Sequence, residues 1–372
     1  MLIGNEENTL FKRIEWNLVF VMLALNLVGL INLYSATHGP FAGPMEGLFF
    51  NQIIWLGIGW LVFFVTTFID YQFVSRVAYI FYFINLGAIL YVTFFGTVAL
   101  GAQRWIDLGF FRYQPSETMK LCMIMVLAKA LSMRSVDGPG MGLKELALPI
   151  FLLLVPFILV VEQPDLGTAM MLAAIGGSIL IFMKIKARIL IILFSSIAIA
   201  IPMAWKFVLH DYQKARITHF LEPNLDPRGS GYNSIQSKIA VGSGKFLGKG
   251  FRKGTQSQLE FLPERHTDFI FSVLSEEYGF VGSVSTMGLF CVLFLIGLRV
   301  ASTARDKFGA LLTTGVMCYI FWHMFINMGM VIGVLPIVGV PLPLLSYGGS
   351  SMLTTMAGLG LVSSVAYRRY LF

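Results

Sequence analysis

The residues best suited to chemistry lie in the run LPERHTDF, residues 262–269, where a long polar segment leads into an apolar one. Thr267 or Asp268 would stand at the start of a helix, where a carboxylate is electrostatically favoured. If that helix continues, Asp268, Ser272 and Ser275 share one face and form a polar stripe that enters the apolar segment. The alternative is an ordinary helix cap with solvated hydroxyls. Spacing alone leaves both interpretations open, and Asp268 is therefore a candidate for chemistry.

Three potential metal ligands stand close together in the same run, namely Glu264, His266 and Asp268. Carboxylate oxygens and imidazole nitrogens both bind divalent metals. Three such residues in sequence do not establish a ligand geometry, however. We therefore do not predict a metal cage built by the protein alone.

A second polar feature is the run QPSETMK, residues 114–120. Pro115 suits the first turn of a helix, which places Glu117 and Lys120 ~3–8 Å inside the outer end of a membrane span. Either ion alone would cost ~2.5–3.5 kcal/mol near the bilayer centre and less at this depth. Their i, i+3 spacing allows them to pair. A structural ion pair is favoured over a catalytic role.

Two other segments could hold an anion. Arg104 and Arg112 stand beside aromatic residues, and two arginines can bind a phosphate bidentately; they could equally anchor the chain at the membrane interface. The uncharged connection 329–349 ends in a Gly-Gly-Ser helix start near Ser350, whose free N–H groups could receive an anion. An ordinary cap on the last helix is favoured there.

The elements that must position these residues are membrane spans. The 372 residues are 56% hydrophobic and only 13% charged, too little charge to cover the surface of a soluble domain. A span needs about 20 apolar residues. Ten stretches meet that requirement, at roughly 17–37, 49–69, 74–95, 115–131, 146–161, 166–183, 188–208, 269–298, 308–328 and 350–367. We predict an all-α polytopic membrane protein with about ten transmembrane helices in one domain, residues 1–372.

Two local features refine these spans. The turn at 162–165 separates two of them, and Asp165 is suited to cap the helix that follows. The stretch 269–298 would rise ~45 Å as one helix, too long for a single perpendicular span. Glu276, Glu277, Gly279 and Gly282 indicate a break, with the crossing itself at about 280–298.

One connection is much longer than the rest, at residues 209–268 between the seventh and eighth spans. Loops of this length without a domain of their own are usually functional. The stretch 232–241 is predicted to form a short surface helix, and the glycines beyond it indicate irregular backbone. The connection also carries a cationic cluster, formed by Lys245, Lys249, Arg252 and Lys253.

Lysine and arginine concentrate in cytoplasmic loops of membrane proteins. With the N-terminus inside, the short inner segments contain Lys12, Arg13, Arg76, Lys129, Arg134, Lys144, Lys184, Lys186, Arg188, Arg299, Arg305, Lys307, Arg368 and Arg369. The short outer loops contain only Arg104 and Arg112. Both termini are therefore predicted to be cytoplasmic, with the long connection outside.

Several functional classes lack support. The net charge of +7 could suggest nucleic acid, but the basic residues stand in short loops between apolar runs, so no nucleic acid partner is predicted. There is no P-loop and no G-x-S-x-G motif. Any energy must then come from a gradient or from the substrate itself.

In combination, the polar motifs resemble the SEDS family of bacterial shape, elongation, division and sporulation proteins. The matching runs are LPERHTDFIF at 262–271, SEEYGFVG at 275–282, QPDLGT at 163–168, RWI at 104–106, QPSE at 114–117 and PLLSYGGSS at 343–351. The first hundred residues match only in hydropathy. Arg265 before His266, preceded by GTQSQ at 254–258, is similar to the elongation-type branch.

The resemblance implies a peptidoglycan glycosyltransferase that polymerises lipid II outside the bacterial cytoplasmic membrane. It also implies ten helices, the elongation machinery and a class B penicillin-binding protein that crosslinks the product. The family's essential aspartate, proposed to be catalytic, corresponds to Asp268, and its buried ion pair corresponds to Glu117 and Lys120.

The implied chemistry fits the polar residues. The donor carries an undecaprenyl pyrophosphate leaving group, and Asp268 could take the proton of the acceptor hydroxyl. An ordinary aspartate is a weak base at neutral pH, so we predict partial burial that raises its pKa. Direct displacement at an α-linked donor would invert it to a β-linkage.

Substrate or pyrophosphate would be bound by basic and polar side chains beside Asp268. The candidates are Arg104, Arg112, Lys245, Lys249, Arg252, Arg265, His266, Ser272 and Ser350, with a divalent cation, Mg²⁺ or Mn²⁺, as a further source of positive charge. Two alternatives remain: a lipid II flippase, and a scaffold that holds a penicillin-binding protein. The crowding of embedded charges at the outer rim and the lack of an internal repeat favour the enzyme over a transporter.

Overall fold

The computed structural model describes residues 13–38, 46–99, 102–107, 109, 112–134, 140–207, 211–222, 230–259 and 261–369. Lys12 lies outside the described residues. The ten predicted spans are all found as helices: α2 (Trp16–Thr37), α3 (Glu46–Phe68), α4 (Tyr71–Phe95), α5 (Pro115–Ser132), α6 (Leu143–Glu162), α7 (Leu166–Phe182), α8 (Ala187–Phe207), α12 (Ile270–Ser302), α13 (Lys307–Ile332) and α14 (Gly349–Arg368). The prediction of an all-α polytopic membrane protein is confirmed.

Seven helices among the described residues are long and apolar enough to cross a membrane: α2, α3, α4, α6, α8, α12 and α13. Helix α7 is apolar but shorter. Helices α5 and α14 carry more polar residues, and nearly all of their side chains are buried. Because they face protein rather than lipid, these two helices can carry polar groups that would be costly at the lipid surface.

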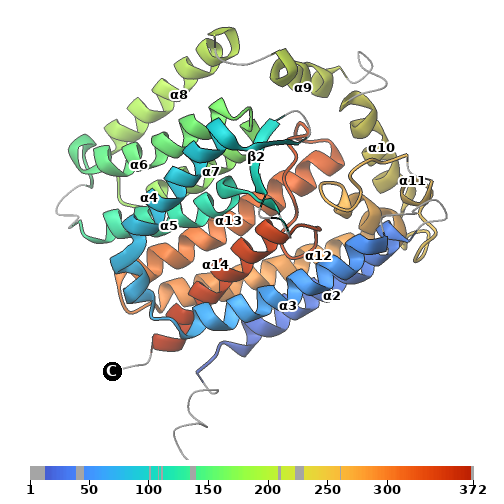
Figure 1. The fold of residues 1–372 in the computed structure, drawn as a ribbon, viewed down its shortest axis with the longest axis horizontal. Helices are drawn as coiled ribbons and strands as arrows, with labels where there is room; N and C mark the ends of the chain where they lie inside the picture. Colours follow the sequence, from blue (N-terminus) through green and yellow to red (C-terminus); the bar gives the residue numbers. More distant parts are fainter. Residues whose placement is uncertain are drawn as a thin grey trace, which may run out of the picture.

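Helices α5, α13 and α14 form the centre of the bundle (Figure 1). Helix α3 packs on α14, while α4 and α7 pack on α5. Helix α12 lies between α2 and α13. Helix α8 lies at the edge of the molecule, and none of the described side chains in its most apolar stretch is buried (Figure 1).

The segment before α5 contains a small antiparallel sheet that the sequence analysis did not predict. It is formed by β1 (Thr97–Ala99), β2 (Ala102–Asp107) and β3 (Arg112–Tyr113) in the order β1-β2-β3. Ile106 pairs with Tyr113, and Trp105 pairs with Thr97. The sheet gives the segment around Arg104 a defined backbone geometry at the outer end of α4 and α5.

The long connection contains α9 (Asp211–Leu221), α10 (Ser230–Ser243) and α11 (Thr255–Gln258). Residues 209–210, 223–229 and 260 of this connection lie outside the described residues. Helix α10 confirms the helix predicted at 232–241. It is not purely a surface helix, because Ser234, Ser237 and Ala240 are buried where α10 packs on α12 and α13.

The predicted break in the eighth span is found at Gly279, which has φ +63° and ψ −156°. The backbone groups freed by the break bond to the loop 245–250. Phe280 N–H donates to the Lys245 carbonyl at 2.9 Å, and Lys249 N–H donates to the Glu276 carbonyl at 3.0 Å. Since the segment 280–302 rises ~34 Å, it is long enough to cross the hydrocarbon core by itself.

Helix α12 begins at Ile270, with Phe269 as its N-cap residue. The prediction that Thr267 or Asp268 starts the helix is therefore wrong by two to three residues. Asp268 belongs to the preceding turn, which Glu264 stabilises through the hydrogen bonds from Thr267 N–H at 3.1 Å and Phe269 N–H at 3.2 Å. Asp268 is consequently not part of a helical stripe with Ser272 and Ser275.

Candidate functional site

Asp268 lies in the turn before α12, facing the uncharged connection between α13 and α14. The Asp268 side chain is partly buried. Gly339 of that connection has φ +75°, and a Cβ atom placed on it would stand 3.3 Å from Asp268 Oδ2. A glycine is therefore required here for two reasons: its left-handed backbone, and the close approach of the carboxylate.

The backbone around Asp268 is held by side chains from two other segments. Asn327 Nδ2 of α13 donates to the Asp268 carbonyl at 2.8 Å. Ser346 Oγ donates to the Thr267 carbonyl at 2.7 Å, and Tyr347 N–H donates to the His266 carbonyl at 3.0 Å. The three consecutive carbonyls of residues 266–268 are thus all bonded outside their own segment, which fixes the direction of the Asp268 side chain.

The pKa of the Asp268 carboxyl is raised to about 7, mainly by burial and also by the negative charge of Glu264, while Arg216 of α9 acts in the opposite direction. An unperturbed aspartate has a pKa of ~3.9. The predicted partial burial is thus found. At neutral pH this carboxyl divides between its two protonation states, which suits a group that takes up a proton.

His266 lies beside Asp268 but differs in character. Burial lowers the pKa of its imidazole, although Glu264 has the opposite effect. Its Nε2 stands 3.8 Å from Glu264 Oε2, and its buried Nδ1 has no hydrogen-bond partner among the described residues. A largely neutral His266 can donate or accept a hydrogen bond, but it is poorly suited to neutralise a pyrophosphate.

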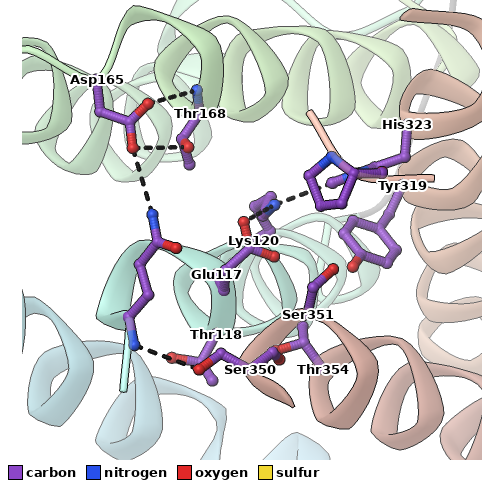
Figure 2. Close-up of polar contacts among 12 residues, drawn as sticks. Glu117, Thr118, Lys120, Asp165, Thr168, Tyr319, His323, Ser350, Ser351 and Thr354 are labelled. Carbon is purple, nitrogen blue, oxygen red and sulfur yellow. Dashed lines mark hydrogen bonds and ion pairs between the residues drawn. The ribbon is translucent and has the colours of Figure 1, made fainter. Parts of the chain in front are cut away.

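The ion pair predicted in the fourth span is present and buried. Lys120 Nζ stands 2.7 Å from Glu117 Oε1, with 1% and 7% of the two side chains exposed (Figure 2). Lys120 Nζ also stands 2.9 Å from His323 Nε2 of α13, and 5.5 Å from the centre of the Tyr319 ring. The pair is therefore a three-helix contact, because the Tyr319 hydroxyl in turn bonds Thr355 of α14 at 3.0 Å.

Sequence reasoning missed the part that α13 plays. Tyr319, His323 and Asn327 follow one another at intervals of four residues in an otherwise apolar span, so they share one helix face. All three are buried. This spacing is a signal by which the sequence alone could have identified the stripe.

A second network surrounds Asp165, and it confirms the cap predicted at this residue. The Asp165 carboxylate accepts from Thr168 N–H at 3.2 Å and from Thr168 Oγ1 at 2.9 Å. Gln114 Nε2 reaches the same carboxylate at 3.4 Å, and the Gln114 N–H lies 3.4 Å from Ser350 Oγ (Figure 2). The starts of α5, α7 and α14 are thereby joined at one end of the bundle.

Arg104 is part of this network. It donates to the carbonyls of Gln163 and Pro164 and stands 3.6 Å from Asp165. Those bonds use most of its guanidinium, so Arg104 holds the turn between α6 and α7. Its predicted contact with a phosphate would require it to give up bonds that the structure shows.

Arg112 and Ser350 stand close together, but their side chains differ in whether they are free to bind an anion. Ser350 Oγ donates to the Arg112 carbonyl at 3.3 Å, which makes it a link between β3 and α14. The Arg112 side chain is 62% exposed, and the carboxylate of Asp107 is 4.0 Å away. The Arg112 side chain therefore remains open to an anion.

The cationic cluster of the long connection is divided in the same way. Lys249 Nζ donates to the fully buried Glu276 at 2.7 Å and is committed to it. Arg252 donates to the His38 carbonyl and lies over the Tyr34 ring, with its guanidinium 5.9 Å from the ring centre. Lys245 is exposed and remains available.

Two further candidates are structural. Arg265 is buried and donates to the Ala36 carbonyl at 2.8 Å, which ties the turn of Asp268 to α2. Ser272 is buried, and its hydroxyl shares a 2.9 Å hydrogen bond with Ser237. The Ser272 hydroxyl therefore joins α12 to α10.

A metal ion would need a set of protein ligands that the described residues do not provide. Among them, no three His, Cys, Asp or Glu side chains come together. Glu264 is the acidic group whose charge acts on Asp268. A divalent cation there would require additional oxygen ligands from a substrate.

A sequence model of the family described as cell cycle protein (FtsW, RodA and SpoVE) matches residues 15–371. The peptidoglycan glycosyltransferase MrdB of Escherichia coli strain K12 is 41% identical over 352 residues, covering 95% of this chain and 93% of that protein. The peptidoglycan glycosyltransferase RodA of Treponema pallidum strain Nichols is 33% identical over 428 residues, covering 95% and 98%.

Two solved structures are similar along nearly the whole chain. A chain of a peptidoglycan synthase complex, described as coordinating polymerization and crosslinking, has a TM-score of 0.82 and 32% identity, covering 96% of this chain and 99% of that one. The Thermus thermophilus rod shape determining protein RodA has a TM-score of 0.71 and 30% identity, covering 96% and 98%. The likeness therefore extends to both sequence and architecture.

Proposed function

This chain belongs to the FtsW/RodA/SpoVE family of cell cycle proteins, and from that premise we propose that Asp268 is the general base with which it polymerises lipid II. The chain is a peptidoglycan glycosyltransferase of the elongation type. The environment of Asp268 carries this proposal. Its carboxyl is partly buried and has a pKa of about 7, and the carbonyls of residues 266–268 in its turn all accept hydrogen bonds from other segments.

In the proposed reaction the acceptor sugar hydroxyl attacks the anomeric carbon of the donor. Asp268 takes the hydroxyl proton as the new carbon–oxygen bond forms. The bond between the anomeric carbon and the pyrophosphate oxygen breaks, and undecaprenyl pyrophosphate leaves with the bonding electrons. A single displacement inverts the donor centre and gives a β-linkage.

The leaving group gains negative charge, which must be met by positive groups. Arg112 and Lys245 are predicted binding residues that remain exposed, as does Arg252, which donates to the His38 carbonyl. A divalent cation, Mg²⁺ or Mn²⁺, bound mainly by pyrophosphate oxygens is part of the proposal. The structural role of bonding the segments around the site is assigned instead to Arg104, Lys249, Arg265 and Ser272.

We further propose that both termini face the cytoplasm of a bacterial cell and that Asp268 faces the opposite side of its cytoplasmic membrane. The unequal distribution of lysine and arginine among the short loops supports this orientation. The similarity to a synthase complex supports a class B penicillin-binding protein of the elongation machinery as the partner that crosslinks the glycan.

The test compares Asp268→Asn with Glu222→Gln, which removes an exposed charge from the same long connection. The purified variants, reconstituted with the crosslinking partner, are incubated with lipid II, and the glycan polymer is separated by length. Asp268→Asn is expected to lower the rate by ~10²–10⁴-fold, the range of a lost general base. Glu222→Gln is expected to retain the rate.

The same reaction separates the two other functions. Normal polymer from Asp268→Asn would remove the base assignment. A flippase would move lipid II between leaflets without product, and a scaffold would do neither. A parallel reaction with a chelator, restored by added Mg²⁺ or Mn²⁺, tests the proposed cation.

A further inference from the structure

Two buried side chains of α13 hold neighbouring carbonyls of the connection 333–348 that lies against Asp268. His323 Nδ1 stands 3.1 Å from the Pro341 carbonyl, and Asn327 Nδ2 donates to the Val340 carbonyl at 2.7 Å. Neither side chain has any exposed surface. They are four residues apart and therefore act from the same helix face.

The contact with Lys120 determines where the His323 ring carries its proton. A charged lysine can only donate hydrogen bonds, so His323 Nε2, at 2.9 Å from Lys120 Nζ, must be the acceptor. The proton is then on Nδ1, which donates to the Pro341 carbonyl. The Glu117–Lys120 ion pair and the connection are thus joined through one neutral imidazole.

Asn327 completes the link to Asp268. The same Nδ2 group that donates to Val340 donates to the Asp268 carbonyl at 2.8 Å. Gly339, next to Val340, is the residue against which Asp268 Oδ2 packs. Asn327 therefore holds both the backbone of Asp268 and the connection beside its carboxylate, while His323 holds the next carbonyl of that connection.

We propose that His323 and Asn327 form a positioning clamp that sets the place and surroundings of the Asp268 carboxylate. The clamp rests on the role proposed for Asp268 in the reaction. His323 and Asn327 are positioning residues, since they bond the backbone that carries and contacts the carboxylate. The Glu117–Lys120 pair contributes by orienting the His323 ring.

Loosening the clamp has two consequences. A general base displaced by ~1 Å from its productive position can lose ~10²-fold in rate. In addition, water that enters between residue 339 and the carboxylate favours its ionised form, which lowers the raised pKa of Asp268.

The charged groups that act on this carboxyl are Glu264 of its own turn and Arg216 of α9. The clamp residues of α13 are neutral, and the connection 333–348 has no charged residue.

The test uses the full chain reconstituted with its crosslinking partner and compares two substitutions of His323. In His323→Gln the amide can accept from Lys120 and donate to Pro341, whereas His323→Leu can do neither. His323→Leu is expected to lower kcat by at least ~10-fold, to leave KM for lipid II within about twofold, and to move the acid limb of the pH profile to lower pH. His323→Gln is expected to restore the rate and the acid limb.

Two controls make the result specific. Trp322→Phe removes a hydrogen bond from α13 to Ser178 of α7 and leaves the connection untouched, so its pH profile is expected to be unchanged. Hydrogen exchange of the amides of residues 337–347 provides a readout that needs no activity. It is expected to be faster in His323→Leu and in Asn327→Leu, and normal in His323→Gln.

Equal rates and equal pH profiles in His323→Leu and the unchanged chain would overturn the clamp. A lost rate with normal exchange at 337–347 would also overturn it, because His323 would then act by another route. If the exchange results hold while Asp268→Asn keeps full activity, the clamp positions the turn, and the base assignment is what fails.

Discussion

At the scale of single residues, the proposed mechanism depends on one carboxyl whose pKa is changed by its surroundings. Asp268 is surrounded by uncharged backbone from another segment, with Glu264 and Arg216 as the charges that act on it in opposite directions. A carboxyl with a raised pKa is a stronger base than ordinary aspartate. As the pH falls, its ionised form is protonated at a higher pH than that of an ordinary aspartate.

The pH dependence of kcat/KM should therefore show an acid limb near pH 7, because the pKa of Asp268 is raised to about 7, mainly by burial. Below it the rate is expected to fall about tenfold per pH unit, because only the ionised form accepts a proton. Initial rates of lipid II polymerisation between about pH 5.5 and 8.5 provide the measurement. A flat profile down to pH 5.5 would contradict the assignment.

Two neighbouring charges should move that limb in opposite directions. Glu264→Gln removes a negative charge that raises the pKa of Asp268, so the limb is expected at lower pH. Arg216→Gln removes a positive charge that lowers it, so the limb is expected at higher pH. The same kinetic series measures both variants, and shifts of equal sign would show that the charges do not act on this carboxyl.

The buried ion pair gives a prediction about stability. Lys120→Met leaves Glu117 charged and unpaired, which should lower the free energy of unfolding by about 3–5 kcal/mol. The double variant Glu117→Met/Lys120→Met removes both charges and should recover much of that loss. Thermal unfolding in lipid nanodiscs compares the unchanged chain with the two variants, and a double variant no more stable than Lys120→Met would mean that the two charges are not coupled.

Sequence reasoning identified Asp268 and the ion pair, because a carboxylate at a polar-to-apolar boundary and an i, i+3 pair are local patterns. It did not identify the partners of Arg104 and Ser272, since Pro164 and Ser237 come from other parts of the chain. Types and spacing reveal that a residue is unusual, but only the packed structure shows what it bonds.

At the scale of elements, the broken helix α12 is the clearest departure from a simple span. The break at Gly279 turns four backbone groups toward the loop 245–250, which bonds them. Glu276 adds to this contact, because its buried carboxylate accepts from Lys249 Nζ and from the Gln256 N–H at 3.0 Å. The loop therefore substitutes for the helix turn that the break removes.

Gly279→Ala tests how much this junction matters. A Cβ atom on residue 279 would overlap the Gly248 nitrogen, and a left-handed backbone costs alanine about 1–2 kcal/mol. The variant is expected to unfold at lower temperature and to lose polymerisation. Gly288→Ala in the same helix meets no atom within 4 Å and should be up to about 1 kcal/mol more stable. Equal stability of the two variants would contradict a structural role for the break.

The break could be predicted because the stretch was too long for one span and had two acids, Glu276 and Glu277, close to Gly279 and Gly282. The small sheet β1-β2-β3 could not be predicted in the same way. Its strands are two to six residues long, too short for a period of two to be recognised. Helix α8 was predicted from hydropathy alone, and its exposed apolar surface is consistent with a helix whose neighbours are mainly lipid.

At the scale of the whole molecule, the ends of the bundle differ in charge and in structure. The C-terminal end of α14 and the start of α2 lie at one end, while α10 and α11 lie at the other (Figure 1). Arg369 pairs with Glu15 at 2.7 Å at the first end, which joins the two termini. Asp268 and the long connection lie at the second end, as the loop positions predicted from hydropathy require.

The proposed orientation can be tested with one reactive thiol at each end. Lys253→Cys places a thiol in the exposed long connection, and Thr303→Cys places one between α12 and α13. Cys291 is exposed and is first replaced by alanine, while Cys122 is buried. An impermeant maleimide added to intact cells with a permeabilised outer membrane should label residue 253 and leave residue 303 unlabelled until the inner membrane is opened.

Because arginine and lysine near the ends of spans are retained in the cytoplasm, Arg299, Arg305 and Lys307 should hold residue 303 inside. Labelling of residue 303 in intact cells would place Asp268 on the cytoplasmic side, and a polymerase for an exported lipid-linked substrate would then have its base on the wrong face of the membrane.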